Sequence, residues 1–595
     1  MKQPSLSRVG PASARKRSAR GERVGFNANP LLSVALPSWR SKLMLFMVFC
    51  AFVALAGRAF YLMGGVSTGF LQRQGEARYA RTLDIPATRG RITDRNGVVL
   101  ASSVPAKAVW AIPDDVDATP EQVNRLARLL GMNPAEVKRR LADDDRSFVY
   151  LRRQVDTEVA DRIAELKIPG IHSSREFKRH YPEGPTSAHI IGFTNVEDRG
   201  QEGVELAHEK QLAGRSGSRR VIKDRLGRIV EDDWLREPFD GRDLALSIDN
   251  RIQYIAHSAL KGALERYRAK AGAAVVIDVR SGEVLALANL PTYDPNARGR
   301  LSGDAIRNRV LTDTFEPGST MKPFSIVAAL EAGKVRPDTK IQTAPGKLTI
   351  GNRTIGDAHP HGLLSVEEVV AKSSNVGTAK IALELPAQTL WDMYTAAGFG
   401  QAPQLGFPGA VTGRLRPARS WRPIEQATIS YGHGVSVTLM QLARAYTALA
   451  RDGDMVPLTL LKQDAPPGAV RVMSQETTMA MRRMLEMAVG PDGTAPGARI
   501  PGYRVAGKTG TAHKLKNGQY VRDYVASFVG FAPVSDPRIV VAVMIDEPSG
   551  EHYGGIVAAP VFAQITAASL RTLQVAPDGP MEETRAPLLA MRGPR

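Results

Sequence analysis

Hydrophobic periodicity divides the chain into a short apolar run and two long parts of different character. Residues 43–63 form the apolar run. Residues 64–237 mix short alternating segments and Gly-rich turns with helical patterns at 120–130 and 134–141. Residues 241–574 carry longer and more regular patterns. Because 595 residues are too many for one compact core, we predict a multidomain α+β protein with a single N-terminal transmembrane helix and a mixed α/β domain ahead of a larger domain.

The larger domain is predicted to hold one antiparallel sheet flanked by helices. A strand-like segment at 244–248 opens it, and two β runs at 273–279 and 284–290 follow, joined by a short turn. Two more runs lie near its far end, at 524–531 and 538–545. The residues between these pairs have mostly helical and loop-like patterns. Strands at both ends of a region with helices between them are typical of one sheet covered by helices.

Two turns in the smaller domain resemble each other, Thr93–Gly97 and Lys223–Gly227. The pair Asn96-Gly97 between apolar flanks is typical of a β-hairpin, because a type I′ turn needs residues that adopt positive φ. Two interpretations remain open. The two turns belong to strands of one small sheet, or Asp-Arg-x-Gly is simply a common turn sequence.

The apolar run is predicted to anchor the chain in a membrane. A helix that crosses ~30 Å of hydrocarbon needs about 20 residues, and 43–63 suffices if Arg58 extends towards the interface. Ala54-Leu55-Ala56 resembles a signal-peptidase site, so a cleaved signal is the alternative. We favour the uncleaved anchor because hydrophobicity resumes after Arg58. In both cases the rest of the chain is exported.

The net charge of +19 is unevenly distributed, and this changes its meaning. Residues 1–42 contain nine Lys and Arg side chains against the single acid Glu22. A basic segment before a membrane helix stays in the cytoplasm by the positive-inside rule, so the charge does not indicate nucleic-acid binding. Residues 1–42 and the Pro-rich segment 575–595 are predicted to be disordered. Cys50 is the only cysteine, which leaves the exported part without disulfides or thiolate metal ligands.

Three short motifs carry the candidate chemistry. The first is Ser319-Thr-Met-Lys322, where Gly318 and Pro323 indicate a helix start. Residues three apart on a helix are neighbours, so the Lys322 amine can reach the Ser319 hydroxyl. Free lysine has a pKa of ~10.4, so Lys322 needs burial or a neighbouring cation to act as a base at neutral pH.

The other two motifs complete a possible pocket. Ser373-Ser-Asn375 is predicted in a loop between helices, where it offers a hydroxyl and an amide. Lys508-Thr-Gly-Thr511 is predicted on a β-strand, where Lys508 offers a fixed ammonium and Gly510 lets a ligand backbone approach. A lone Ser-x-x-Lys is usually a solvated helix face. The three motifs in this order, each in its expected setting, instead indicate a serine acyltransferase pocket.

The motifs and their neighbours resemble those of class B penicillin-binding proteins, particularly the cell-division type. The likeness runs from the anchor to about Phe562. One departure is His552 before Tyr553, where the family pattern suggests an aromatic residue. In the larger domain the similar segments are Glu316–Phe324, Lys372–Gly377, Tyr431–Thr438 and Gly507–Ala512. In the smaller domain, which resembles the non-catalytic pedestal of that family, they are Arg89–Gly97, Phe148–Gln154, Arg179–Pro182, His189–Asn195 and Glu202–Glu205.

The resemblance implies a five-stranded sheet in the larger domain and a D,D-transpeptidase activity. Ser319 attacks the bond between the two terminal D-alanines of a peptidoglycan stem pentapeptide, with Lys322 as base, and an amine from a neighbouring stem then takes the acyl group. Backbone N–H groups of Ser319 and Thr511 hold the oxyanion. The remaining roles that it implies are proton relay by Ser373, a grip on the donor amide by Asn375, and binding of the terminal carboxylate by Lys508, Thr509 and Thr511 beside Gly510.

The resemblance also implies β-lactams as inhibitors and a location in the bacterial inner membrane, with the catalytic domain in the periplasm at the division septum. The FtsW glycan polymerase is an expected partner, since no glycosyltransferase unit is evident. We expect no metal or cofactor, because His359 and His361 flank a proline and lack partner ligands. Alternatives are an elongation-type transpeptidase, a β-lactamase or carboxypeptidase, and a β-lactam sensor or scaffold with little turnover.

Overall fold

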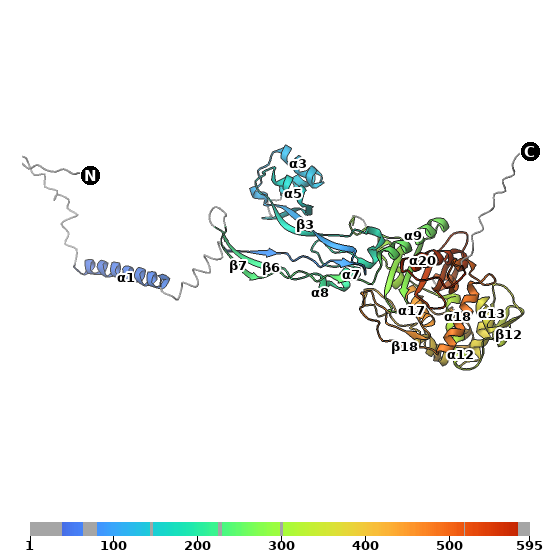
Figure 1. Cartoon of the computed structure of the whole chain (residues 1–595). Helices are drawn as coiled ribbons and strands as arrows, with labels where there is room; N and C mark the ends of the chain where they lie inside the picture. Colours follow the sequence, from blue (N-terminus) through green and yellow to red (C-terminus); the bar gives the residue numbers. More distant parts are fainter. Residues whose placement is uncertain are drawn as a thin grey trace, which may run out of the picture. The chain divides into compact units, whose positions relative to one another are not determined.

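The computed structural model describes residues 38–63, 80–142, 147–223, 229–297, 302–516 and 518–580 of the chain (Figure 1). Contacts divide the chain into two units, one of residues 1–83 with 220–233 and the other of 84–219 with 234–595. The second unit holds both the pedestal sheet and the catalytic sheet described below.

The first unit contains the apolar helix α1, Ser38–Met63. Among the described residues it is the helix long and apolar enough to cross a membrane. It begins at Ser38, so residues 38–42, predicted as part of a disordered tail, are helical instead. A polar first turn suits the end of such a helix because its free backbone N–H groups need polar surroundings. Strands β1 (Ala80–Ile85), β6 (Gly217–Lys223) and β7 (Ile229–Arg236) form a three-stranded sheet in the order β1-β6-β7.

The pedestal of the second unit is a five-stranded sheet with helices at one end (Figure 1). The order β4-β3-β2-β8 joins Val149–Asp156, Val99–Ala111, Ile92–Thr93 and Leu244–Ala245, and β5 (Ile171–His180) also pairs with β3. Helices α3 (Pro120–Leu130), α4 (Pro134–Leu141) and α5 (Thr157–Ala164) share one apolar core with β3 and β4. Both predicted helices are thus confirmed at their predicted bounds.

Two details of the pedestal differ from the sequence prediction. The Asn96-Gly97 turn joins β2 to β3, but only Gly97 has positive φ (88°), so the turn is not type I′. The Asp94 carboxylate holds the turn instead, because its Oδ1 accepts 2.8 Å bonds from the N–H groups of Asn96 and Val98. The similar turn at 223–227 lies largely outside the described residues, but β6 and β7 belong to another sheet than β2 and β3, so the one-sheet interpretation is wrong.

The catalytic sheet has five antiparallel strands in the order β10-β9-β21-β20-β19, which confirms the predicted sheet. Side chains alternate between its two faces. On β9, for example, Val275 and Ile277 enter one apolar core, whereas Ala274 and Val276 enter the other. The strands are β9 (Ala271–Asp278), β10 (Val284–Leu290), β19 (Ala506–Lys516), β20 (Gln519–Ala532) and β21 (Ile539–Asp546).

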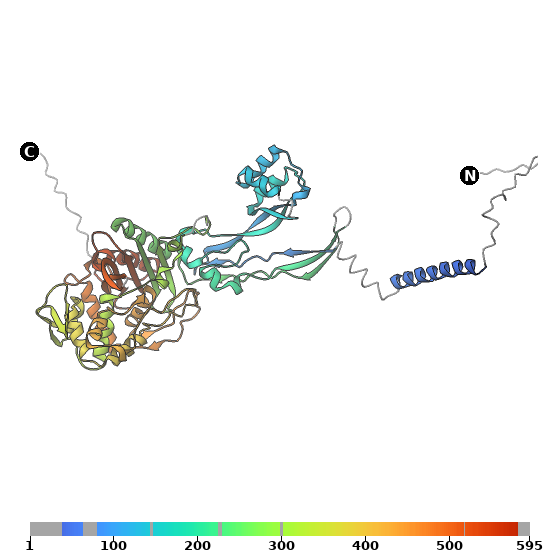
Figure 2. The same cartoon turned by 180° about the vertical axis from the view of Figure 1, so that it is seen from behind.

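Helices cover both faces of this sheet. Helices α9 (Asn250–Tyr267) and α20 (Ala559–Thr572) lie side by side on one face, and the same green and red helices are adjacent in the reverse view (Figure 2). Helices α17 (Leu439–Ala450) and α18 (Gln475–Val489) pack on the other face, with α12 (Lys322–Glu331) beyond them. Helix α12 begins at Lys322, directly after the turn that carries Ser319. The first motif therefore lies on this second face of the sheet.

Shorter elements connect the main ones. The helices are α6 (Ala188–Ile191), α7 (Gly203–Ala207), α8 (Glu209–Leu212), α10 (Gly303–Ile306), α11 (Arg309–Thr312), α13 (Val366–Ala371), α14 (Asn375–Leu383), α15 (Ala387–Ala396), α16 (Pro423–Ser430) and α19 (Gly554–Val557). The strands are β11 (Thr314–Phe315), β12 (Lys340–Gln342), β13 (Lys347–Ile350), β14 (Arg353–Gly356), β15 (Leu363–Ser365), β16 (Val437–Thr438), β17 (Asp454–Met455) and β18 (Val470–Arg471). The 3₁₀ turns are η2 (Pro113–Asp115), η3 (Gly184–Thr186), η4 (Gly318–Met321), η5 (Ala418–Ser420) and η6 (Pro496–Ala498).

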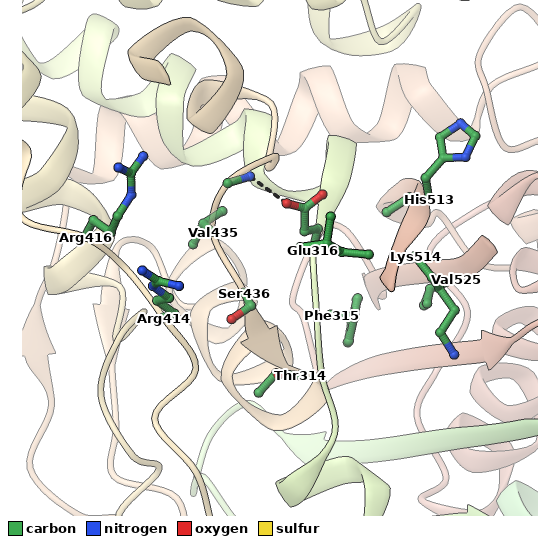
Figure 3. Close-up of a pocket in the computed structure, with 13 residues that line it drawn as sticks. Thr314, Phe315, Glu316, Arg414, Arg416, Val435, Ser436, His513, Lys514 and Val525 are labelled. Atoms are coloured by element: carbon green, nitrogen blue, oxygen red, sulfur yellow. Dashed lines mark hydrogen bonds between the residues drawn. The ribbon is translucent and has the colours of Figure 1, made fainter. Parts of the chain in front are cut away.

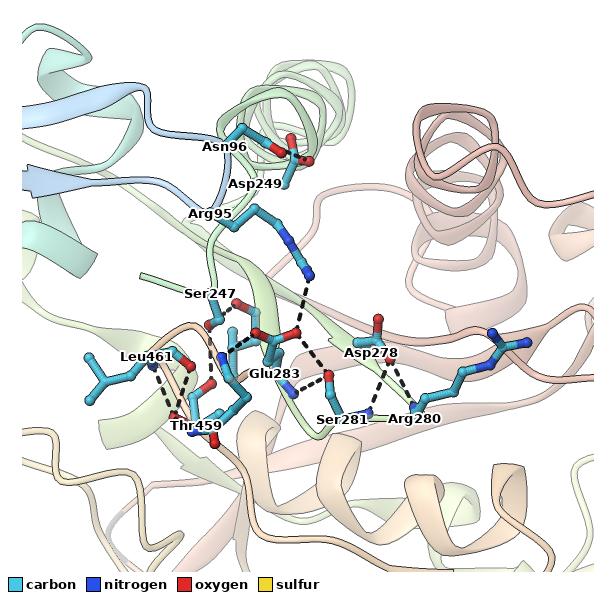
Figure 4. A network of polar contacts seen from close by, with 12 residues as sticks. Arg95, Asn96, Ser247, Asp249, Asp278, Arg280, Ser281, Glu283, Thr459 and Leu461 are labelled. Carbon is cyan, nitrogen blue, oxygen red and sulfur yellow. Dashed lines mark hydrogen bonds and ion pairs between the residues drawn. The ribbon is translucent and has the colours of Figure 1, made fainter. Parts of the chain in front are cut away.

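A polar network joins the β2–β3 turn to the catalytic sheet (Figure 4). Arg95 Nη2 lies 3.2 Å from Glu283 Oε2, and Asn96 Nδ2 donates to Asp249 Oδ2 at 3.1 Å. Glu283 is buried and also accepts from the Gln463 N–H and the Ser281 hydroxyl, both at 2.9 Å. Strand β8, predicted to open the catalytic domain, pairs with β2 of the pedestal. The two domains therefore share hydrogen-bonded backbone at their junction.

The end of the described chain is also held in place. Residues 575–580 were predicted to be disordered, but the Asp578 carboxylate accepts from the N–H groups of Arg504 (2.8 Å) and Ser535 (3.1 Å). The Gly579 N–H donates to Gly502 O at 3.0 Å. Pro-rich composition favoured disorder at this end, and these contacts with residues far away in sequence override it.

Candidate active site

The first motif forms a tight turn at the start of α12. Gly318–Met321 is the 3₁₀ turn η4, and Lys322 is the first residue of the α-helix. Gly318 has φ +56° and donates its N–H to Gly432 O at 3.2 Å, while the Tyr446 hydroxyl donates to Thr320 O at 2.9 Å. The turn is thus fixed from both sides, and the half-buried Ser319 lies at its centre.

The amine of Lys322 is fully buried and lies against the second motif. Its Nζ donates to Ser373 O at 2.5 Å and to Ser373 Oγ at 3.1 Å. Burial, and secondly the charge of Lys508, hold the pKa of Lys322 well below its ordinary value, although the Asp357 carboxylate opposes them. Lys322 was expected to reach the Ser319 hydroxyl, but its amine is bonded to Ser373. In the part of the chain that the structure describes, the Ser319 hydroxyl makes no hydrogen bond.

Ser373 and Ser374 of the second motif lie, as predicted, in the loop between α13 and α14, whereas Asn375, predicted in the same loop, is the first residue of α14 because Ser374 caps the helix there. Ser373 has φ +60°, a left-handed conformation that is costly for a residue other than glycine and is concentrated at functional sites. Asn375 Nδ2 donates to Gly356 O at 2.8 Å. The Ser374 hydroxyl caps α14 by accepting the Gly377 N–H at 2.9 Å, so its role is structural.

Asp357 anchors this loop, and no sequence motif had pointed to this residue. Its Oδ2 accepts from the Ser374 hydroxyl at 2.8 Å, and its Oδ1 accepts from the N–H groups of Asn375 (2.5 Å) and Val376 (3.0 Å). Asp357 follows β14 in an irregular segment, next to the His359 and His361 pair that we considered and set aside as metal ligands. Only its long-range contacts identify it, and it is the carboxylate that opposes the pKa depression of Lys322.

The third motif lies on strand β19, as predicted, and its lysine is fully buried. Lys508 Nζ lies 3.3 Å from Thr509 Oγ1, and burial lowers the pKa of Lys508 to about 7. The Thr509 hydroxyl donates to Thr494 Oγ1 at 3.3 Å, and Thr511 Oγ1 accepts the Gly554 N–H at 3.0 Å. A row of hydroxyl groups therefore follows the buried ammonium along this strand.

The nucleophile turn packs directly on this strand. A Cβ at Gly318 would lie 3.4 Å from Thr511 O, and one at Gly510 would overlap Ser527 Oγ and lie 2.8 Å from Pro317 O. Glycine at 510 is therefore required by the protein's own packing, and access for a ligand backbone stays a prediction. The close approach places the backbone of Thr511 next to the turn that carries Ser319.

Aromatic side chains cluster near the nucleophile turn and strand β19. His433 lies 5.2 Å from Tyr431 and 6.2 Å from Tyr520 between ring centroids. Burial, and then the charge of Lys322, lower the pKa of His433 to about 4, so this ring is neutral at physiological pH. His552, the departure from the family pattern, stacks on Tyr524 at 4.0 Å and lies 4.6 Å from Tyr553. The imidazole thus provides the flat ring that the pattern suggests at this position.

The structure brings three segments that are far apart in sequence together: Lys322 is bonded to Ser373, its amine feels the charge of Lys508, and the turn that carries Ser319 packs on Gly510 and Thr511. The five-stranded sheet, the serine turn at a helix start and the lysine on an edge strand together define the penicillin-binding class of serine acyltransferases.

Comparisons with known proteins agree with this class. Residues 272–567 match the penicillin binding protein transpeptidase domain, and 84–246 match the penicillin-binding protein dimerisation domain. The chain is 43% identical over 537 residues to the probable peptidoglycan D,D-transpeptidase PenA of Neisseria gonorrhoeae, covering 89% of this chain and 92% of the relative. It is 41% identical over 549 residues to the peptidoglycan D,D-transpeptidase FtsI of Escherichia coli K12, covering 91% and 93%.

A solved structure gives the same result for the catalytic domain. The transpeptidase domain of Burkholderia pseudomallei penicillin-binding protein 3 is 51% identical, with a TM-score of 0.53, covering 56% of this chain and 98% of that one. The chain belongs to the class B penicillin-binding proteins, the family of the FtsI and PenA transpeptidases.

Proposed function

We propose that this chain is a serine D,D-transpeptidase that cross-links peptidoglycan stem peptides during septal wall synthesis and is inhibited by β-lactams. The observation that supports it most strongly is the buried amine of Lys322, which bonds to no carboxylate of the described residues and has a pKa held well below its ordinary value. A neutral amine in this place is a base next to the turn that carries Ser319.

The reaction proceeds in two acyl transfers. Ser319 Oγ attacks the carbonyl between the terminal D-alanines while Lys322 takes its proton, and the N–H groups of Ser319 and Thr511 stabilise the oxyanion. The C–N bond breaks, and the proton passes through Ser373 to the leaving D-alanine amine. An amine of a second stem peptide then attacks the ester, its proton returns to Ser319, and an amide cross-link forms. Asn375 holds the donor amide, and Lys508, Thr509 and Thr511 hold the donor carboxylate.

Fluorescent penicillin labelling of the full-length chain tests the nucleophile. Ser319→Ala should remove the label completely, whereas Ser420→Ala, at an exposed serine away from the cleft, should keep it. Label on Ser319→Ala would mean that another residue is acylated. Cross-linking of supplied pentapeptides then distinguishes the transpeptidase from other members of the class. D-alanine release without cross-links would indicate a carboxypeptidase, and rapid loss of bound penicillin a β-lactamase.

We further propose a single-pass topology in the inner membrane. Residues 1–42 lie in the cytoplasm, 43–63 span the membrane within α1, 64–237 form the periplasmic pedestal, 241–574 form the catalytic domain, and 575–595 form a tail. The basic residues before α1 support this orientation. The FtsI name of a close relative supports a septal site and a partnership with the FtsW polymerase. Protease digestion of right-side-out spheroplasts should remove the catalytic domain, and its protection would reverse the topology.

A further inference from the structure

A cavity lies beside the nucleophile turn, and two segments of its lining are continuous in sequence with the catalytic motifs (Figure 3). Its volume is about 520 Å³. One wall is Thr314–Glu316, the strand β11 and the residue that leads into the Ser319 turn. The other wall is Ala512–Leu515 of β19, directly after Lys508–Thr511. A peptide bound at Ser319 can therefore extend into this cavity.

Arg414 is held rigidly at the edge of the cavity. Its N–H donates to Ser436 O at 2.7 Å, and its O accepts the Ser436 N–H at 3.0 Å. Ser436 precedes β16, which pairs with β11, so a hydrogen-bonded path connects Arg414 to the Ser319 turn. Gly413, with φ +63°, and the 2.7 Å bond from Gln441 Nε2 to Thr412 O fix the segment before it. The backbone of Arg414 thus has a defined position relative to the nucleophile.

The charges around the cavity leave one guanidinium available. Arg416 is 2.8 Å from Glu425, and Lys514 is 2.8 Å from both Asp546 and Glu547. Glu316 accepts from the Gly434 N–H and from the Tyr520 hydroxyl. Among the described residues that line this cavity, exposed Arg414 is the arginine or lysine whose side chain has no hydrogen bond or ion pair. Arg414 and Arg416 lie on one side of the cavity and His513 and Lys514 on the other, with Glu316 and Phe315 between them (Figure 3).

We propose that this cavity binds a stem-peptide carboxylate other than that of the terminal D-alanine, and that Arg414 is the residue that recognises it. The inference rests on the proposed function, which supplies the peptide. A planar guanidinium recognises a carboxylate through two parallel hydrogen bonds, which fixes the orientation of the peptide as well as its charge. The carboxylate belongs to the donor stem or to the acceptor stem, and the experiment distinguishes them.

The test uses the full-length chain in detergent with two synthetic pentapeptides, one with free side-chain and α-carboxylates and one with these carboxylates amidated. Both keep the terminal D-alanine carboxylate. The donor arm measures D-alanine release, and the acceptor arm measures cross-linking to a free or amidated acceptor with one fixed donor. Arg414→Ala should lower kcat/KM for the free peptide about tenfold, mainly through KM.

Amidation should cost the wild type a similar factor in the same arm, and it should cost Arg414→Ala nothing further, because the two changes remove one interaction. The arm that shows this coupling identifies whether Arg414 binds the donor stem peptide or the acceptor stem peptide. Arg414→Lys should retain part of the preference, and Arg419→Ala, at an exposed arginine that does not line the cavity, should behave as the wild type.

Additive losses in both arms, or a wild type indifferent to amidation, would overturn the inference, while cross-linking by the wild type would still uphold the proposed function. The comparison of peptides on the wild type decides this even if Arg414→Ala does not fold. No D-alanine release from either peptide by the wild type would instead refute the proposed function, and this inference with it.

Discussion

The pedestal and the catalytic cleft both bury cations, but they treat them in opposite ways. In the pedestal, Arg89 and Arg179 are fully buried on either side of Glu205, with Nε–Oε distances of 2.6 and 2.7 Å. Although burial lowers it, the carboxylates of Glu205 and Glu209 raise the pKa of Arg89 above its ordinary value. In the cleft, Lys322 and Lys508 are fully buried, and within the described part of the chain their partners are hydroxyl and carbonyl groups rather than carboxylates.

Burial removes the cation from water in both places, but the consequence depends on whether a carboxylate is bound to it. A buried cation paired with carboxylates keeps its proton, and removing the partner is strongly destabilising. A buried amine without a carboxylate loses its proton more readily and becomes a base. Arginine suits the first role because it does not deprotonate, and lysine suits the second.

Removing the cleft base should have the largest effect. Lys322→Ala should lower the rate of acylation by penicillin about 10³-fold, because general-base catalysis contributes roughly 10²–10⁴. Stopped-flow or gel-based acylation kinetics measure this, with a thermal melt to show that the variant is folded. Lys334→Ala, at an exposed lysine just beyond the same helix, is the matched control and should acylate normally. Near-normal acylation by folded Lys322→Ala would show that another group takes the proton.

Removing the shared acid of the pedestal should affect stability instead. Glu205→Gln leaves buried Arg179 without its ion-pair partner and Arg89 with Glu209 alone, which should lower the free energy of unfolding by about 3–5 kcal/mol. Denaturant unfolding of the full-length chain in detergent measures it. Glu197→Gln, at an exposed acid paired with Arg153, should cost under about 1 kcal/mol. Equal losses in the two variants would mean that burial does not distinguish these ion pairs.

Removing the acid nearest the cleft lysines should have the smallest effect and the most specific signature. Asp357 raises the pKa of Lys322, so Asp357→Asn should move the rising limb of the acylation pH profile to lower pH. Because Asp357 also anchors the Ser373 loop, we expect the maximal rate to fall about tenfold. A rising limb that moves to higher pH would contradict the electrostatic role of Asp357. Asp338→Asn, at an exposed acid outside the cleft, should change neither quantity.

The sequence predicts the features that depend on short segments. The apolar runs in 273–290 and 524–545 predict four of the sheet strands, and Gly318 with Pro323 predicts the helix start that presents Ser319. Motif order predicts that residues 319, 373 and 508 share a cleft.

Features that depend on contacts between distant segments could not be predicted in this way. Asp357 has no motif around it, and its role arises only where β14 meets the Ser373 loop. Strand β8 has an ordinary apolar pattern, and that pattern does not say that its partner is β2 of the other domain. Residues 575–580 read as a disordered tail because their composition does not reveal the N–H groups of Arg504 and Ser535 that Asp578 binds.

The most direct test of the central claim, a neutral Lys322 next to a charged Lys508, is the pH dependence of acylation by penicillin in the wild type and in Lys508→Met. Acylation needs Lys322 without its proton and Lys508 with it. The wild-type rate should therefore rise with a midpoint well below the ~10.4 of free lysine and fall again near pH 7, where Lys508 loses its proton. Lys508→Met should lose the falling limb and move the rising limb to higher pH. A rising limb near pH 10 in the wild type, or one that Lys508→Met leaves in place, would contradict the account.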